Sequence, residues 1–130
     1  MAFIAPIGVL MPGCDPVQPD LVVVRAEDTA IIADRRIRGV PTLLVEVLSP
    51  ASVEADTEIK RKAYARAGVP EYWIVRPAQR DVLCYAQPDR TLDDYTHVER
   101  IPPEGQLAAV TLPLQITVAA LFAGAPDTTL

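Results

Sequence analysis

The sequence predicts one α/β domain built on a mixed β-sheet, with a central helix after the strand that carries Glu46. Three observations favour this class: short runs rich in β-branched and aromatic residues, one long helical segment between two such runs, and proline or glycine turns separating the elements. At 130 residues the chain can bury a core without disulfides or metals. We therefore expect a single domain over residues 1–130.

Short strands dominate the first part of the chain. Residues 1–19 are rich in proline and predict an extended entry with one short strand between Phe3 and Leu10. Residues 22–25 and 30–37 predict two strands joined by the polar turn 26–29. Residues 42–49, an apolar run of strand length, predict the next strand.

A helix is predicted over residues 53–67, with Asp56 as a plausible N-cap and Gly68 closing its end. Residues 71–75 and 81–85 predict two strands around the turn 76–80, and residues 94–101 predict a more exposed strand. Residues 116–122 form a short amphipathic element of one or two helical turns.

Glu46 is the least expected residue in this pattern, because it lies inside an otherwise apolar strand. Burying an isolated ionised carboxylate costs several kcal/mol, so we expect a metal ion, a nearby cation or a raised pKa to compensate it. Asp20 stands just before another β-branched run, residues 21–24. If the two strands pair, two carboxylates meet at a strand end, and such a pair suits a hard divalent cation.

Charge and cysteine content limit the possible functions. The net charge of −5 disfavours a protein that coats nucleic acid by electrostatics alone. Residues 35–66 nevertheless carry seven basic and four acidic residues, which suits a phosphate-bearing substrate, although a solvated helix face also explains such a run. Cys14 and Cys84 form no metal-binding pattern and are expected to be reduced thiols.

No stretch approaches the roughly 18 to 20 unbroken apolar residues of a membrane span, and the N-terminus lacks signal-peptide organisation. We therefore expect a cytoplasmic protein that does not bind membranes.

Four segments together resemble the Uma2 (DUF820) family of the PD-(D/E)xK, restriction-endonuclease-like superfamily. They are Pro19-Asp20, Glu46-Val-Leu-Ser-Pro50, Asp56-x3-Lys60-x3-Tyr64 and Gly68-Val-Pro-Glu-Tyr-Trp-Ile-Val75. The resemblance covers roughly residues 17–86 and implies a restriction-endonuclease-like mixed sheet. It also implies that Asp20 and Glu46 bind Mg²⁺ or Mn²⁺ and that both take part in catalysis. Leu48 stands where the superfamily usually has its lysine, so the resemblance assigns the catalytic amine to Lys60 on the following helix.

These parts suit a metal-dependent endonuclease that hydrolyses phosphodiesters of nucleic acid, with DNA as the expected substrate. A metal ion neutralises phosphoryl oxygens and activates water, and a positive side chain orients that water. On a helix, Lys60 and Tyr64 lie one turn apart on one side, with Asp56 a turn earlier, so all three could face the two acids.

Simpler explanations remain for most of these residues. Asp20 could begin a strand after a proline, Lys60 could be a solvated helix residue, Asp56 could be only an N-cap, and Tyr64 could belong to the core edge. His97 has the features of an ordinary surface residue, and Tyr72, Trp73 and Tyr85 those of core or interface aromatics.

Members of the family usually carry further residues before the Pro-Asp motif, whereas only nineteen precede Asp20 here. We therefore expect a domain shortened at its N-terminus that forms a homodimer to cover exposed surface. Two alternatives to a nuclease stay open. One is a catalytically silent relative that acts as a dimerising or partner-binding module, and the other is an unrelated α/β binding protein in which Glu46 is neutral or paired with an arginine.

Overall fold

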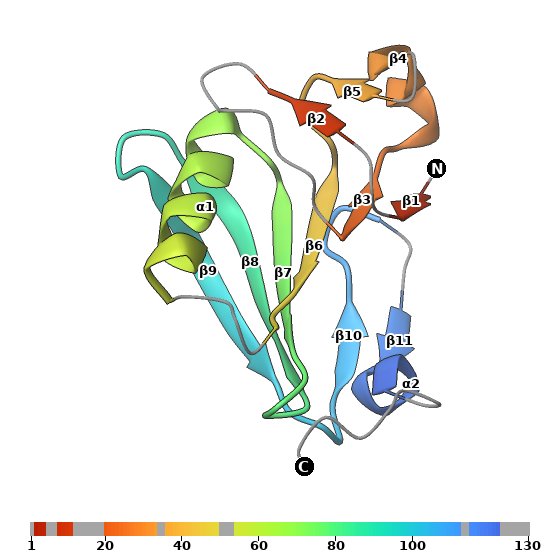
Figure 1. Cartoon of the computed structure of the whole chain (residues 1–130), viewed down its shortest axis with the longest axis vertical. Coiled ribbons are helices and arrows are strands. Elements are labelled where there is room, and N and C mark those ends of the chain that lie inside the picture. The colour runs from red at the N-terminus through yellow and green to blue at the C-terminus, as the bar shows by residue number, and fades with distance from the viewer. Residues whose placement is uncertain are drawn as a thin grey trace.

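The computed structural model describes residues 2–4, 8–11, 20–33, 36–49, 54–112 and 115–122, without the side chains of 2–4, 26, 33, 54–56, 121 and 122. Its centre is a six-stranded sheet in the order β1-β3-β6-β7-β8-β9 (Figure 1). The strands are β1 (Ala2–Ile4), β3 (Leu21–Val23), β6 (Leu43–Val47), β7 (Glu71–Arg76), β8 (Asp81–Asp89) and β9 (Asp94–Ile101). The sheet is mixed, because β6 and β7 run parallel while the other neighbouring pairs are antiparallel.

Helix α1 (Glu54–Ala67) connects the two parallel strands, which need a crossover between them. The helix ends at Gly68, whose φ of 87° is in the left-handed region that glycine adopts most readily. The N–H groups of Gly68 and Val69 both donate to the Tyr64 carbonyl, at 3.1 and 3.0 Å. This closure fixes where the chain leaves the helix and enters β7.

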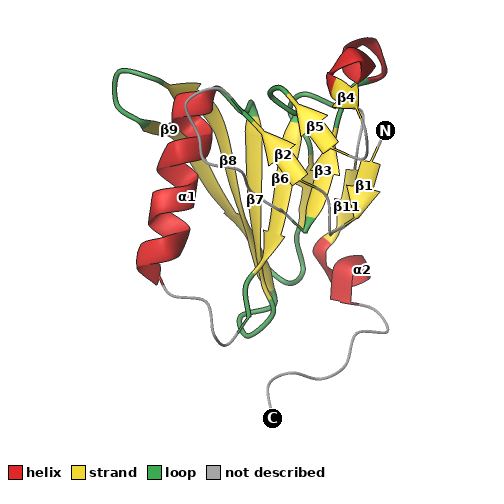
Figure 2. Ribbon diagram, turned by 45° about the horizontal axis from the view of Figure 1, so that its top comes forward, coloured by secondary structure: helices red, strands yellow, loops and turns green. Residues whose placement is uncertain are grey.

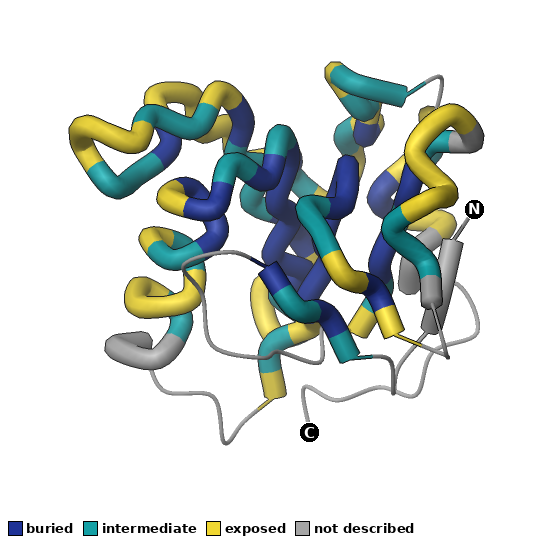
Figure 3. Tube along the Cα trace, turned by 90° about the horizontal axis from the view of Figure 1, so that it is seen from above, coloured by how far each residue is buried: buried dark blue, intermediate teal, exposed yellow. Residues whose placement is uncertain are grey.

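Layers on both faces of the central sheet enclose two cores. On one face lie α1 and a three-stranded sheet of β2 (Gly8–Leu10), β5 (Arg36–Arg38) and β4 (Ile32–Ala33), packed on Leu44, Tyr72 and Ile74 (Figure 2). On the other lie β10 (Gln106–Ala108), β11 (Gln115–Thr117) and α2 (Val118–Phe122), packed on Val45 and Trp73. Buried positions are accordingly concentrated in the central strands (Figure 3).

The fold class predicted from the sequence is confirmed, and most elements lie where they were expected. The region 26–37 differs: residues Ala26–Ile31 form a 3₁₀ helix rather than a turn, and the long predicted strand is reduced to β4 and β5. Strand β10 was not predicted, and the element at 116–122 combines β11 with α2. Among the helices described, none is long and apolar enough to cross a membrane.

Candidate functional site

Strand pairing brings Asp20 beside Glu46. Strands β3 and β6 are antiparallel, with Leu21 opposite Val45 and Val22 opposite Leu44. One step outward from Leu21, the same register sets Asp20 opposite Glu46, and strand alternation directs both toward the face that α1 covers. The Asp20 side chain is held there, because the Val47 N–H donates a hydrogen bond of 2.6 Å to its Oδ2. The two acids therefore share one strand end and one face of the sheet.

The Glu46 carboxylate is buried, with 8% of the residue exposed, and three side chains contact it. Tyr64 on α1 donates to Oε1 at 2.9 Å, and Tyr72 on β7 donates to Oε2 at 2.8 Å. Lys60 Nζ lies 3.5 Å from Oε1. Two phenols and one ammonium thus replace the water that burial removes from this carboxylate.

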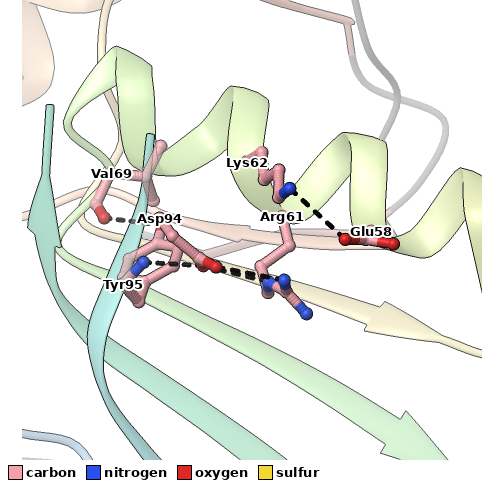
Figure 4. Close-up of polar contacts among 6 residues, drawn as sticks. All are labelled: Glu58, Arg61, Lys62, Val69, Asp94 and Tyr95. Atoms are coloured by element: carbon pink, nitrogen blue, oxygen red, sulfur yellow. Dashed lines mark hydrogen bonds and ion pairs between the residues drawn. The ribbon is translucent and has the colours of Figure 1, made fainter. Parts of the chain in front are cut away.

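Lys60 and Lys62 have different surroundings although two residues separate them. Lys62 pairs with Glu58 on the helix surface, with Nζ 3.3 Å from Glu58 Oε1 (Figure 4). A two-residue step rotates a side chain by about 200° around a helix, which explains why only Lys60 reaches the sheet. The Lys60 side chain remains 49% exposed, so its ammonium also faces solvent.

The other sequence candidates have distinct positions. Helix α1 begins at Glu54, so Asp56 lies within its first turn rather than at the N-cap, and its side chain is outside the described part. Tyr64 is fully buried and also binds Glu46, so it is both a core residue and a site residue. His97 is exposed on β9.

Tyr72 was interpreted from the sequence as a core aromatic, and its bond to Glu46 was missed. The signal that could have revealed it is strand pairing: Leu44 faces Tyr72 in the parallel β6–β7 ladder, so Tyr72 lies on the face of Glu46 and one step away. Burial and the neighbouring Glu46 raise the pKa of the Tyr72 hydroxyl well above its ordinary value. The hydroxyl therefore stays protonated and acts as a donor to the carboxylate.

Two further acids, which were not singled out from the sequence, are also buried. Glu71 is 2% exposed and accepts hydrogen bonds from the backbone N–H and the hydroxyl of Thr111. Asp81 is fully buried and binds Arg76 through both oxygens, at 2.7 Å each, and Arg100. The hydrogen bond from Arg76 is the main reason that the pKa of Asp81 is lowered. Asp81 also has a half-exposed cation as a partner, since the Arg100 side chain is 53% exposed. What distinguishes Glu46 is the second acid, Asp20, that lies opposite it at the strand end.

The donors at this strand end fit a magnesium or manganese ion. Mg²⁺ prefers carboxylate oxygens and is commonly held by one or two of them, with waters completing its coordination. Each carboxylate has about four lone-pair positions, so the hydrogen bonds to Asp20 and Glu46 leave acceptor capacity on both. Among the described residues, no group of three or more His, Cys, Asp or Glu side chains could hold a metal. The metal hypothesis for Asp20 and Glu46 is therefore one of two protein carboxylates with water as the remaining ligands.

Comparison with known proteins identifies relatives of this chain. A search of curated proteins finds no significant match. The solved structures include a similar one, the crystal structure of "a putative nuclease belonging to DUF820" from Anabaena variabilis ATCC 29413. It shares 15% sequence identity with a TM-score of 0.69, and the match covers 94% of this chain and 67% of that one. The model of the family described as "Uma2: Putative restriction endonuclease" matches residues 1–120. The chain therefore belongs to the Uma2 family.

Proposed function

We propose that this protein is a metal-dependent endonuclease that hydrolyses phosphodiester bonds of nucleic acid, with DNA as the expected substrate. Asp20 and Glu46 would hold Mg²⁺ or Mn²⁺, and Lys60 would be the cation that orients the attacking water. When bound, the metal supplies neutralisation of the phosphoryl oxygens and a lowered pKa for a coordinated water.

The observation that carries this proposal is the position of Lys60. Its ammonium lies 3.5 Å from Glu46 Oε1 and is half exposed, so a water near the carboxylate could also be within its reach. Tyr64 and Tyr72 hold the two oxygens of Glu46 from different elements, and this fixes the orientation of the carboxylate.

A nuclease assay tests the proposal. Purified protein is incubated with single-stranded and double-stranded DNA in the presence of Mg²⁺ or Mn²⁺, and wild type is compared with Glu46→Gln. We expect the variant to lose cleavage and metal affinity while remaining folded, because the amide keeps the shape of the side chain but removes its charge. Metal affinity is measured independently, as the rise in melting temperature with Mn²⁺.

Lys60 and Lys62 provide a matched pair for the amine. Lys60→Ala should reduce cleavage by about 100-fold or more, the usual effect of removing one electrostatic donor from a reacting site, whereas Lys62→Ala should change it less than about twofold. Equal loss in both variants would assign the effect to the general charge of α1.

The silent-relative hypothesis remains the main alternative. It predicts neither cleavage nor a metal-dependent rise in melting temperature in well-folded wild type. The burial of Glu46 favours it more than any other feature of the site.

We also propose a homodimer and a cytoplasmic location. Large hydrophobic side chains that stand exposed in the described part of one chain support the dimer: Val47, Ile59, Leu92, Val98 and Val110. A cytoplasmic location agrees with the free thiol of Cys84, whose pKa burial raises to about 12, so that it is unreactive.

A further inference from the structure

A cavity of about 410 Å³ lies on the α1 face of the sheet, directly beside Glu46. Two of its lining residues are neighbours of that acid: Ile74 pairs with Glu46 across the parallel β6–β7 ladder, and Leu48 follows it by two residues. Leu48 continues the ladder, since its N–H donates to the Val75 carbonyl at 2.9 Å. The floor of the cavity is therefore adjacent to Glu46 in the candidate site.

The cavity has an aliphatic floor, and residues with planar phenol and guanidinium groups form part of its sides. Leu48, Ile74 and Leu83 supply the aliphatic floor, and the remaining lining residues are Tyr85, Arg61, Arg76, Thr57, Glu58 and Gln79. The Arg61 guanidinium lies over the Tyr85 ring, 5.5 Å from its centroid. Aliphatic, phenolic and guanidinium surfaces together favour a flat aromatic ligand over a bare phosphate.

Both arginines are fixed by acids, which makes them planar surfaces rather than free charges. Arg61 donates to the two carboxylate oxygens of Asp94 at 3.0 and 3.1 Å (Figure 4). Arg76 binds Asp81 in the same two-point manner. Such bidentate pairs hold the guanidinium plane in place and offset most of its charge.

The positive charge of α1 is largely paired and therefore poorly suited to tracking a duplex. Each basic residue of α1 pairs with an acid: Lys60 with Glu46, Arg61 with Asp94, Lys62 with Glu58 and Arg66 with Asp93. Duplex binding draws most of its affinity from many phosphate contacts, and a chain of net charge −5 with paired cations is poorly equipped for it. Proteins that bind single strands also contact phosphates, but they gain further affinity by stacking unpaired bases, which a duplex does not offer.

We infer that this cavity holds one unpaired nucleobase of the substrate, adjacent to the phosphodiester that is hydrolysed at the Glu46 site. The substrate is then a single-stranded nucleic acid. The inference rests on the proposed function for the position of the phosphate. The cavity volume lies within the roughly 300–1,000 Å³ range of small-ligand pockets. A base seated on the aliphatic floor contacts the plane of Arg61 or Arg76, and its phosphate points toward Glu46 and Lys60.

Binding without cleavage tests the inference. Fluorescence anisotropy of short labelled oligonucleotides is measured in EDTA, with single-stranded DNA, RNA of the same sequence and the DNA duplex as probes. Wild type should bind a single strand more tightly than the duplex, and the comparison of DNA with RNA identifies which strand is preferred. Tighter binding of the duplex overturns the inference.

Arg61→Gln and Arg66→Gln form a matched pair. Both arginines lie on α1 and pair with an acid of the β8–β9 region, and each substitution removes one positive charge. Arg61→Gln should raise the Kd for the single strand about tenfold, the effect of losing a stacking surface, and Arg66→Gln less than about twofold. Equal effects overturn the inference. Leu83→Phe narrows the cavity without changing charge and should weaken binding to a similar extent. If it does not fold, the arginine pair decides.

The two hypotheses can fail separately. If wild type binds single strands in an Arg61-dependent way but cleaves nothing with Mg²⁺ or Mn²⁺, the cavity inference stands and the nuclease proposal fails. If wild type cleaves nucleic acid while Arg61→Gln and Arg66→Gln bind alike, the cavity inference alone is wrong.

Discussion

Replacing Tyr72 with Phe tests whether Glu46 is held as a buried carboxylate. The substitution keeps the ring, which is fully buried, and removes only the hydroxyl that donates to Glu46 Oε2 at 2.8 Å. A hydrogen bond to a charged group contributes about 1.5–3 kcal/mol to the free energy of unfolding. Since Tyr64 and Lys60 remain bound to Oε1, we expect a loss of about 2 kcal/mol.

Tyr95→Phe is the matched control. Tyr95 is 9% exposed, and its hydroxyl donates at 2.8 Å to the Val69 carbonyl, a neutral acceptor. A neutral hydrogen bond contributes about 0.5–1.5 kcal/mol, so this variant should lose roughly 1 kcal/mol less than Tyr72→Phe. The losses of unfolding free energy in both variants are to be measured by urea unfolding at neutral pH. An m-value equal to that of wild type would show that only stability has changed.

A double-mutant cycle with Glu46→Gln isolates the charged contribution. An amide can still pair with a phenol, because the hydroxyl turns to accept from its NH₂ group, so the cost of Tyr72→Phe in the Glu46→Gln background should fall to about 1 kcal/mol. Equal costs of Tyr72→Phe and Tyr95→Phe, together with no coupling in the cycle, would refute a carboxylate stabilised by these phenols.

Three further predictions concern pH, a second buried acid and assembly. The pKa values of Tyr72 and Tyr95 are raised, mainly by burial, so the folded protein keeps protons that the unfolded chain releases above about pH 10. The unfolding free energy should therefore fall as pH rises beyond 10, and Tyr72→Phe should reduce that slope by about 1.4 kcal/mol per pH unit in urea titrations. Asp81→Asn should cost about 2–3 kcal/mol near pH 7, because Asp81 is fully buried while its partner Arg76 is partly exposed. Because the Asp81 pKa is lowered, this cost should be fully present above the ordinary aspartate pKa and should shrink as the solution is acidified below it. A cost that stays constant on acidification would contradict the ion-pair explanation. Light scattering at micromolar concentration should give about twice the 14.1 kDa chain mass, and a monomer mass would remove the dimer proposal.

Elements with strong local signals were predictable from the sequence. Helix α1 ends at Gly68, which adopts the left-handed conformation, as predicted. Strand β9 has the predicted bounds because turns border its pattern on both sides. The region 26–37 was not predictable in the same way. Its β-branched residues favour a strand, but the 3₁₀ helix extends to Ile31, and pairing with β2 supports only the short β5. Tertiary contacts overrode local propensity there.

The candidate site was predictable only in part, because the relevant information lies in strand register. The apolar run around Glu46 indicated a buried acid that needs compensation, and the structure supplies a lysine and two phenols. Tyr72 becomes a partner only through the β6–β7 pairing, which the sequence does not specify. Glu71 and Asp81 were missed as buried acids because their partners, Thr111 and the two arginines, lie on other elements.

If Lys60 is the catalytic amine, as proposed, its position on a helix rather than on the strand links the proposed activity to the packing of α1. Lys60 and Tyr64 are one helical turn apart and contact the same atom, Glu46 Oε1. A small shift of α1 along the sheet would therefore remove the cation and one of the two phenols together. Because the amine comes from α1, position 48 is free to carry a leucine, and that leucine forms the floor of the cavity beside the acid. A lysine at position 48 would place a charge on this floor, where a stacked base would have to displace its water. Under the two proposals, an amine on the helix therefore allows an apolar pocket for a base to lie beside a charged site for the phosphodiester.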